Sequence, residues 1–456
     1  MFYADDLCLL SKDPGEVQRM LAYLEQYSMR KGLTVNAGKS CVVVFNSRAN
    51  ISMDFTYGGV SLERLDQFKY LGIIFDKDGS MSWADRQWAR NLMLAQFDIS
   101  RLAKEHGVEG RVDILLQLFQ TYGVSQGLYA AHIWSTPYLA ADRTFASAVQ
   151  QQQQSFLRRL THARRGTPSW VLLDEFGQKP FQFYWWKLVT KFWNQCATEC
   201  NSDLFRGVFK SDVCLAQAGC TDCWSGEVLA GLRSLPADSE EVHAACEANF
   251  LGCQSLPWKP IEARLISSYV SFWEQFDNVP SARSDGVVMR KTCTYAKEFR
   301  VDTREGLAAG QPPQVFPPLL SFYKRGLTHD EVCRVSRFRL GSHHLGVERG
   351  RYHHIAWHER VCDRCSAEFL QSEAFLSRNR VAVDDELHAI FDCQAFDHLR
   401  STFGHFPDPP SVRGFFSGDN IDAYRFVSRI MEIVDERAAR TSPEANQPSQ
   451  ADGQPL

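Results

Sequence analysis

The chain has 456 residues, of which 44% are hydrophobic and 23% charged, an ordinary balance for a globular protein of about two to four domains. Lys and Arg total 50 against 54 for Asp and Glu, and the net charge of -4 excludes a uniformly basic, histone-like protein. The longest apolar runs, at 70–75 and 315–320, are far shorter than the ~20 residues of a membrane span. We therefore expect no membrane partner.

Fourteen cysteines could form disulfides, but no charged and apolar signal segment stands at the start of the sequence. Reduced thiols or metal ligands are then the better expectation. This usage predicts an intracellular protein of the nucleus or cytoplasm that is not secreted. The oligomeric state stays open.

The first predicted elements form a small antiparallel sheet with one packed helix. An apolar strand pair interrupted by Asp5 and Asp6 predicts a hairpin whose turn carries carboxylates, and its incoming strand is so short that the chain looks cut there. Asp13 and Pro14 fit the start of a helix that ends near Gly32. Further strands are predicted at 40–45, 55–57 and 68–75.

Beyond residue 80 the apolar spacing becomes helical, and the run Gln150 to Gln154 predicts a polar helix face. Paired prolines at 312–313 and 317–318 mark a boundary before a segment rich in Cys and His. The predicted parts are a sheet-containing domain, a helical segment, a helical connector without assignable chemistry, a basic Cys/His domain and a disordered tail, at 1–80, 81–165, 166–320, 321–440 and 441–456.

The pair Asp5 and Asp6 is the sharpest local signal. Two adjacent carboxylates on a tight hairpin can hold the magnesium ions that activate a 3′-hydroxyl and neutralise triphosphate oxygens. Taken alone, such a pair is more often a solvated turn.

Its context resembles the reverse transcriptases of non-LTR (LINE-like) retrotransposons. Tyr3-Ala4-Asp5-Asp6 is similar to polymerase motif C, residues 32–40 to motif D, and residues 68–72 to motif E. The resemblance implies Mg²⁺ or Mn²⁺ at Asp5 and Asp6, and a proton donor at Lys39. It also implies a primer grip at Phe68, Lys69, Tyr70, Leu71 and Gly72. A plain turn lysine and a simple hairpin remain the alternatives for motifs D and E.

The same resemblance implies parts that this sequence lacks. Motif A, which supplies a further aspartate, the fingers and the template-binding motif B would all precede Met1. Two carboxylates cannot build a paired-metal site, so the palm is expected to be truncated and inactive alone.

A second strong signal is Cys362-x2-Cys365 followed by His388-x4-Cys393, a Cys3His set suited to tetrahedral Zn²⁺. We expect one structural zinc per chain, with His388 and Cys393 on one helix from 384 to 393. The long gap at 366–387 speaks against it, and free thiols with a surface histidine are the alternative. A weaker candidate set comprises Cys214, Cys220, Cys223, His243 and Cys246.

Lysines and arginines are frequent between residues 324 and 360, and Phe338, Tyr352 and Trp357 stand among them. This pattern predicts nucleic-acid contact, with aromatic rings stacking on bases. A plain basic surface is the alternative. Residues 338–351 and 360–362 also resemble the segment before the zinc site of the retrotransposon proteins. The predicted nucleic-acid-binding residues are Arg337, Arg339 and Arg351.

The sequence thus predicts an α+β chain: a truncated polymerase palm, a helical thumb and connector, and a small zinc-binding domain. The resemblance implies part of an RNA-directed DNA polymerase whose partners are an RNA template and a DNA primer or target. The alternative is a non-catalytic, zinc-containing nucleic-acid-binding protein derived from such an element, and a relic without a present role stays open.

Overall fold

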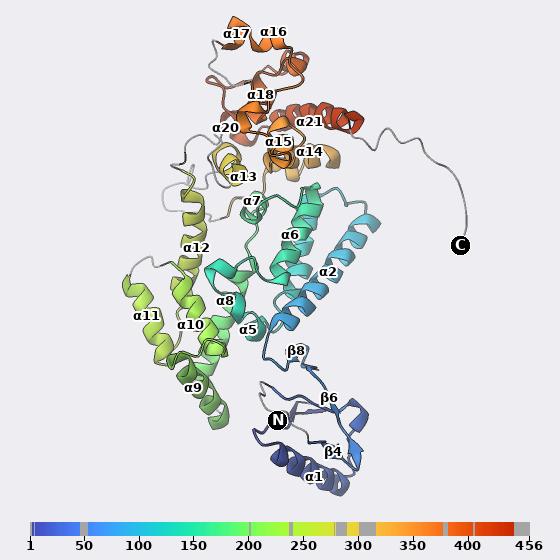
Figure 1. The fold of residues 1–456 in the computed structure, drawn as a ribbon, viewed down its shortest axis with the longest axis vertical. Coiled ribbons are helices and arrows are strands. Elements are labelled where there is room, and N and C mark those ends of the chain that lie inside the picture. The colour runs from blue at the N-terminus through green and yellow to red at the C-terminus, as the bar shows by residue number, and fades with distance from the viewer. Residues whose placement is uncertain are drawn as a thin grey trace, which may run out of the picture. The chain divides into compact units, whose positions relative to one another are not determined.

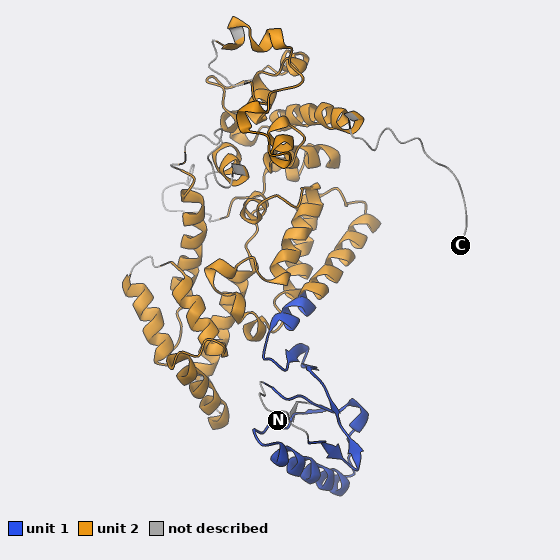
Figure 2. Cartoon of the chain, viewed as in Figure 1, with its two compact units in different colours: residues 1–88 blue, residues 89–456 orange. Residues whose placement is uncertain are grey.

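The computed structural model describes residues 2–3, 5–45, 53–199, 202–236, 240–277, 279, 290–300, 316–376, 382–404 and 406–441. It is mostly helical with small sheets, as the predicted α+β class requires (Figure 1). Two compact units divide it, residues 1–88 and 89–456 (Figure 2), so the first unit extends past the boundary predicted at residue 80. Most of the predicted disordered tail, 442–456, lies outside the described residues.

In the first unit, helix α1 (Pro14–Lys31) has the predicted ends. The Asp13 side chain accepts a hydrogen bond from Gly15 N at 3.0 Å, which satisfies a free amide of the first turn. Gly32 ends the helix in the left-handed conformation, with φ of 63°, which glycine adopts without steric cost.

The strands of this unit are shorter than predicted and form no continuous sheet. Three antiparallel hairpins and one parallel pair are separate two-stranded sheets. The pairs are β1 (Phe2–Tyr3) with β2 (Asp6–Leu7), β3 (Cys41–Val42) with β6 (Glu63–Arg64), β4 (Thr56–Tyr57) with β5 (Val60–Ser61), and β7 (Gln67–Tyr70) with β8 (Ile73–Asp76). Isolated two-stranded sheets are marginal by themselves, and α1 supports β4 through contacts of Leu21 and Gln18.

The core of the first unit is small. Leu21 of α1 packs with Phe55 and Leu62. The Gln18 side-chain amide donates a hydrogen bond to Thr56 O and accepts one from Thr56 N. The prediction of a small sheet packed on one helix is therefore confirmed for the helix and the hairpins. The prediction of one antiparallel sheet is wrong, because most strands have only two residues and pair locally.

The second unit is built from helices, and α2 enters it across the boundary. The helices up to residue 234 are α2 (Ser82–Glu105), α3 (Val112–Leu118), α4 (Val124–Gln126), α5 (Ala131–Trp134), α6 (Ala148–Thr161), α7 (Ser169–Glu175), α8 (Phe181–Asn194), α9 (Asp203–Gln217) and α10 (Trp224–Ser234). The others are α11 (Glu240–Leu251), α12 (Trp258–Glu274), α13 (Arg290–Thr294), α14 (His329–Arg339), α15 (Gly346–Tyr352), α16 (Ala367–Leu370), α17 (Glu373–Leu376), α18 (Glu386–Phe391), α19 (Asp397–Arg400), α20 (Val412–Phe415) and α21 (Ile421–Thr441). Of the helices described, none combines the length and hydrophobicity that crossing a bilayer requires.

Aromatic side chains fill the core of this unit, where Trp134, Trp185, Trp186 and Trp193 are fully buried. The ring of Trp134 meets that of Trp185 edge to face at 5.4 Å. Each buried indole among these donates its N–H to a backbone carbonyl, which offsets the desolvation of that group.

The glutamine run of α6 is helical as predicted, but Gln150, Gln153 and Gln154 lie inside the protein while Gln151 is exposed. Gln150 and Gln153 are 0% exposed and bond to each other at 2.7 Å. Gln150 accepts from Phe181 N at 2.7 Å, and Gln153 donates to Lys179 O at 3.1 Å. These amides satisfy backbone groups at the start of α8, where a helix leaves its first N–H groups without partners.

A buried group of charges joins α7 to the C-terminal part of the chain. Glu175 is 3% exposed, and Arg339 at the end of α14 donates two parallel hydrogen bonds to it, at 2.7 and 2.9 Å. Beside it, Asp174 is fully buried, forms an ion pair with Arg300 at 3.1 Å, and accepts from Tyr295 at 2.9 Å. Burial raises the pKa of Asp174.

Replacing Arg339 with alanine should strongly destabilise the second unit. The change leaves Glu175 buried without its bidentate partner. In comparable pairs this lowers the free energy of unfolding by roughly 3–5 kcal/mol. In contrast, Arg429→Ala removes an exposed partner of Glu432 on α21 and should cost less than about 1 kcal/mol. Denaturant unfolding followed by tryptophan fluorescence compares the two, and equal midpoints would contradict the structural role of Arg339.

Candidate metal centre

The predicted zinc ligands lie on two segments that run side by side. Val361 and Val383 form an antiparallel bridge. Cys362 N donates to Ala382 O, and Asp384 N donates to Arg360 O, each at 2.9 Å. This pairing places the turn that carries Cys362 and Cys365 next to the segment that leads into α18.

Helix α18 and the residues that follow it supply the other two ligands. Asp385 caps the helix by accepting from His388 N at 2.9 Å. Cys393 lies just beyond the helix, where its N–H bonds to His388 O at 2.8 Å. The helix is therefore shorter than the predicted 384–393, yet the bonded turn after it still brings Cys393 back toward His388.

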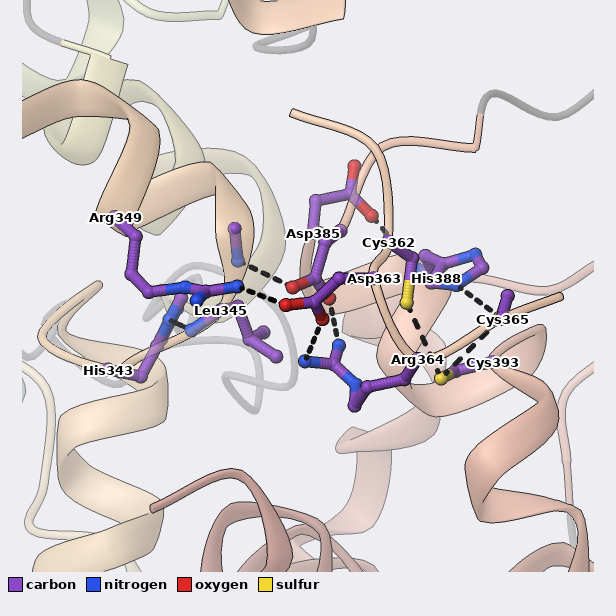
Figure 3. Close-up of polar contacts among 12 residues, drawn as sticks. His343, Leu345, Arg349, Cys362, Asp363, Arg364, Cys365, Asp385, His388 and Cys393 are labelled. Atoms are coloured by element: carbon purple, nitrogen blue, oxygen red, sulfur yellow. Dashed lines mark hydrogen bonds and ion pairs between the residues drawn. The ribbon is translucent and has the colours of Figure 1, made fainter. Parts of the chain in front are cut away.

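The four ligand atoms converge within 4.8 Å of one another (Figure 3). Cys393 Sγ lies 3.7 Å from Cys362 Sγ and 3.8 Å from Cys365 Sγ, and His388 Nε2 lies 3.5 Å from Cys365 Sγ. With Zn–S near 2.3 Å and Zn–N near 2.0 Å, tetrahedral angles separate two sulfurs by about 3.8 Å and sulfur from nitrogen by about 3.5 Å. These contacts match the edges of a zinc tetrahedron.

The surroundings act in opposite directions on two of the thiols, because hydrogen bonds with Cys362 and Cys393 raise the pKa of the Cys365 thiol. Hydrogen bonds from the Cys362 and Cys365 thiols, together with the Arg364 guanidinium, lower the pKa of the Cys393 thiol. Gln394 N donates to Cys365 Sγ at 3.3 Å. Three thiolates and Zn²⁺ carry one net negative charge, and Arg364, which is paired with the buried Asp384, lies close enough to offset it.

One expected detail of the zinc site is not met. Zinc-bound histidines usually donate their second ring N–H to an oxygen. Nδ1 of His388 is buried, and none of the described residues accepts from it. The ring is instead packed edge to face against Phe375, with centroids 6.2 Å apart. Packing against Phe375 therefore contributes to the orientation of the His388 ring.

The predicted polymerase residues lie in the first unit. Asp5 and Asp6 are exposed at the β1–β2 hairpin and belong to no group of three or more metal-binding side chains in the described part of the chain. Lys39 is exposed at the end of a short 3-10 helix, and its backbone N–H bonds to Asn36. Roles in catalysis and in binding Mg²⁺ or Mn²⁺ remain predictions for these residues.

The predicted primer grip forms the β7–β8 hairpin. Phe68 pairs with Phe75 and Tyr70 with Ile73, and Leu71 and Gly72 make the turn with φ of 47° and 87°. Phe68 and Leu71 are 38% and 39% exposed, while Lys69 is exposed and Tyr70 half-buried. The hairpin is confirmed, and primer binding stays a prediction.

The three arginines predicted to bind nucleic acid differ in their placement. Arg339 is 2% exposed and its guanidinium is occupied by Glu175, so it offers no surface to a phosphate, and the prediction for this residue is wrong. Arg337 pairs with Asp435 at 2.6 Å and Arg351 with Glu348 at 3.0 Å. Both are partly exposed, and acidic partners already hold them.

Among the aromatics predicted to stack on bases, only Tyr352 reaches the surface, at 52% exposure. Phe338 and Trp357 are buried, because the segment around them contributes to the core. His343 is likewise buried, with Nε2 2.9 Å from Glu386. Much of the basic segment therefore stabilises the fold.

The described residues place the weaker candidate zinc set in no common ligand group. Cys223 instead caps α10 by accepting from Gly226 N at 3.3 Å. The thirteen described cysteines are free thiols, as expected. A group that sequence reasoning missed comprises His162, His329 and Cys333. The spacing of His329 and Cys333, four residues apart on a helix, was the available signal.

Comparisons with protein-family models, curated proteins and solved structures gave no match for this chain.

Replacing His388 with alanine should remove about one equivalent of zinc per chain, because three thiolates without the imidazole leave the tetrahedron incomplete. Metal analysis after dialysis measures the loss, and new proteolytic cleavage between Val361 and His398 should accompany it. His353→Ala, which changes an exposed histidine, is the control. Equal zinc in the parent and His388→Ala would exclude the site.

Proposed function

We propose that this chain is part of a LINE-like reverse transcriptase and that its second unit holds nucleic acid beside a structural zinc. The convergence of Cys362, Cys365, His388 and Cys393 carries the zinc part of the proposal. The side chains that would hold zinc are the four that the Cys-x2-Cys and His-x4-Cys spacing predicted. A closed Cys3His set leaves no coordination position for a substrate, so the metal would stabilise the local fold.

The polymerase part of the proposal is supported by the two hairpins of the first unit. The β1–β2 hairpin exposes Asp5 and Asp6, and the β7–β8 hairpin exposes Phe68 and Leu71 at its turn and first strand. These are the placements that a metal-binding hairpin and a primer grip would need.

The nucleic-acid surface that we propose is centred on Tyr352, at the end of α15. The Arg164 guanidinium, from the loop after α6, lies 5.6 Å from the centroid of the tyrosine ring. His353 and His354 are exposed next to it. An exposed aromatic ring beside a cation can stack on a base while the cation meets the adjoining phosphate. Arg164, Tyr352, His353 and His354 constitute the Tyr352 surface.

Removing the ring by Tyr352→Ala should weaken binding of single-stranded RNA by roughly 1–3 kcal/mol, the contribution of one stacked base. Tyr122→Ala removes a ring that is 56% exposed elsewhere in the unit and should leave the affinity unchanged. Arg164→Gln should reduce the slope of log affinity against log salt by about 0.7, because one phosphate contact is lost. Fluorescence anisotropy at several salt concentrations measures both effects.

Salt-independent binding, or equal losses from the two tyrosine variants, would contradict this surface. The surface is common to the polymerase and to the non-catalytic binder, so its failure would weigh against both. A primer-extension assay separates those two.

The 456-residue chain alone should incorporate no nucleotides on a primed RNA template with Mg²⁺ or Mn²⁺. In the described residues β1 and β2 pair only with each other, so no neighbouring strand brings a further carboxylate to Asp5 and Asp6. Paired-metal catalysis needs that additional ligand. Incorporation that disappears in Asp5→Asn would overturn the prediction and favour the polymerase over the binder.

A further inference from the structure

A second group of metal-binding side chains lies where α6 meets α14. One ligand atom each from His162, His329 and Cys333 lies within 4.8 Å of the others. Nε2 of His329 is 3.5 Å from Cys333 Sγ. This equals the separation of about 3.5 Å derived above for nitrogen and sulfur on one tetrahedral zinc. The rings of His162 and His329 are perpendicular, with centroids 6.0 Å apart.

The fold brings these side chains together from segments far apart in the sequence. His162 directly follows the last residue of α6, whereas His329 and Cys333 stand four residues apart on α14 and so share one helix face. Gly110 packs against His329 so closely that an added Cβ would lie 2.9 Å from its Cβ. Cys333 is buried with its sulfur 3.9 Å from Leu160 O, while His162 is exposed.

Two further features of the group concern a buried ring nitrogen and the backbone at the end of α6. Nδ1 of His329 is buried, and no described residue bonds to it, which costs free energy for a polar atom. His162 ends α6 in the left-handed conformation, with φ of 54°, and its backbone N–H bonds to Arg158 O as in a common helix C-cap. A cation held at Nε2, the nitrogen that lies near Cys333 Sγ, would leave Nδ1 of His329 unpaired, so the convergence of the three ligand atoms is the observation that indicates a metal site.

We propose that His162, His329 and Cys333 form a second metal site, separate from the Cys3His cluster, for a borderline divalent cation of the zinc class. Two imidazoles and one thiolate are ligands that Zn²⁺ accepts, whereas Mg²⁺ and Ca²⁺ require oxygen ligands. Three protein ligands leave the fourth tetrahedral position to a small molecule such as water on the exposed, His162 side. The ion would also tie the end of α6 to the start of α14.

The decisive variant is His162→Gly, because glycine suits the left-handed backbone at this position. It removes one ligand while relieving backbone strain, so a lower metal content cannot be attributed to unfolding. The matched control is His354→Gly, which makes the same change at an exposed histidine with the same φ of 54° and outside the metal group.

The full chain, purified with its bound metal and dialysed, is analysed for metal and then titrated with Co²⁺ alone. We expect the parent and His354→Gly to hold one more equivalent of metal than His162→Gly. Cobalt bound there should show thiolate charge-transfer absorption, and Cys333→Ser should abolish that band. The affinity of this second site for Co²⁺ should fall by more than about tenfold in His162→Gly. Mutating a residue that only hydrogen-bonds to a metal ligand already costs about that much affinity.

The two metal sites fail independently. Equal metal content and equal cobalt spectra for the parent and His162→Gly would overturn the second site, whatever happens at the first. If His388→Ala loses metal and His162→Gly does not, the result would support the Cys3His cluster and refute the second site. Loss in His162→Gly with full retention in His388→Ala would support the second site and refute the first.

Discussion

The second unit depends on holding two adjacent carboxylates, Asp174 and Glu175, away from water. Isolated buried charges of this kind would be prohibitively costly, so each needs a cation and hydroxyl donors in place. Arg339 is supplied by α14, and Arg300 and Tyr295 by the segment before residue 301. Burial alone would lower the pKa of the Arg339 guanidinium, but the Glu175 carboxylate raises it overall, which keeps the arginine charged. Three distant parts of the chain must therefore dock together or leave a charge unpaired.

Helix α14 transmits this constraint to the rest of the C-terminal region. Its last residue, Arg339, meets α7, while Arg337 and Arg334 form ion pairs with α21. Its first two turns place His329 and Cys333 against the end of α6. The stretch after it continues inward, where the buried His343 meets Glu386 at the start of α18. One helix thus connects the charged core to both groups of metal-binding side chains. The predicted division between connector and zinc-binding domain at residue 320 is crossed by these contacts.

The sequence was informative wherever the structure is determined by neighbours along the chain. The caps of α1 and the hairpin at 68–75 follow from local side-chain chemistry, and the Cys-x2-Cys and His-x4-Cys spacings each fit one bonded turn. It failed where the partner is distant. The sequence does not show that the arginine at position 339 is paired with Glu175 and is therefore closed to a phosphate. It also does not show that Gln150, on the predicted polar helix face, bonds to the start of α8. Polar residues carry no sign of their burial when the group that satisfies them is more than a hundred residues away, as Glu175 is from Arg339.

The long gap between the two halves of the Cys3His set, 366–387, seemed to oppose a zinc site, but its energetic weight is small. Closing a loop costs only about 0.6 kcal/mol more for each doubling of its length. A structural zinc contributes on the order of 10 kcal/mol to local folding in small zinc peptides, which far exceeds that increment. The gap is also partly structured, since α16 and α17 occupy its first part. Phe375 of α17 packs on both Phe369 and the candidate ligand His388. The inserted segment therefore folds back against the ligand cluster. Nδ1 of His388 has no hydrogen-bond acceptor among the described residues, so packing on Phe375 helps to orient the ring, and the inserted segment thereby supports the candidate metal centre.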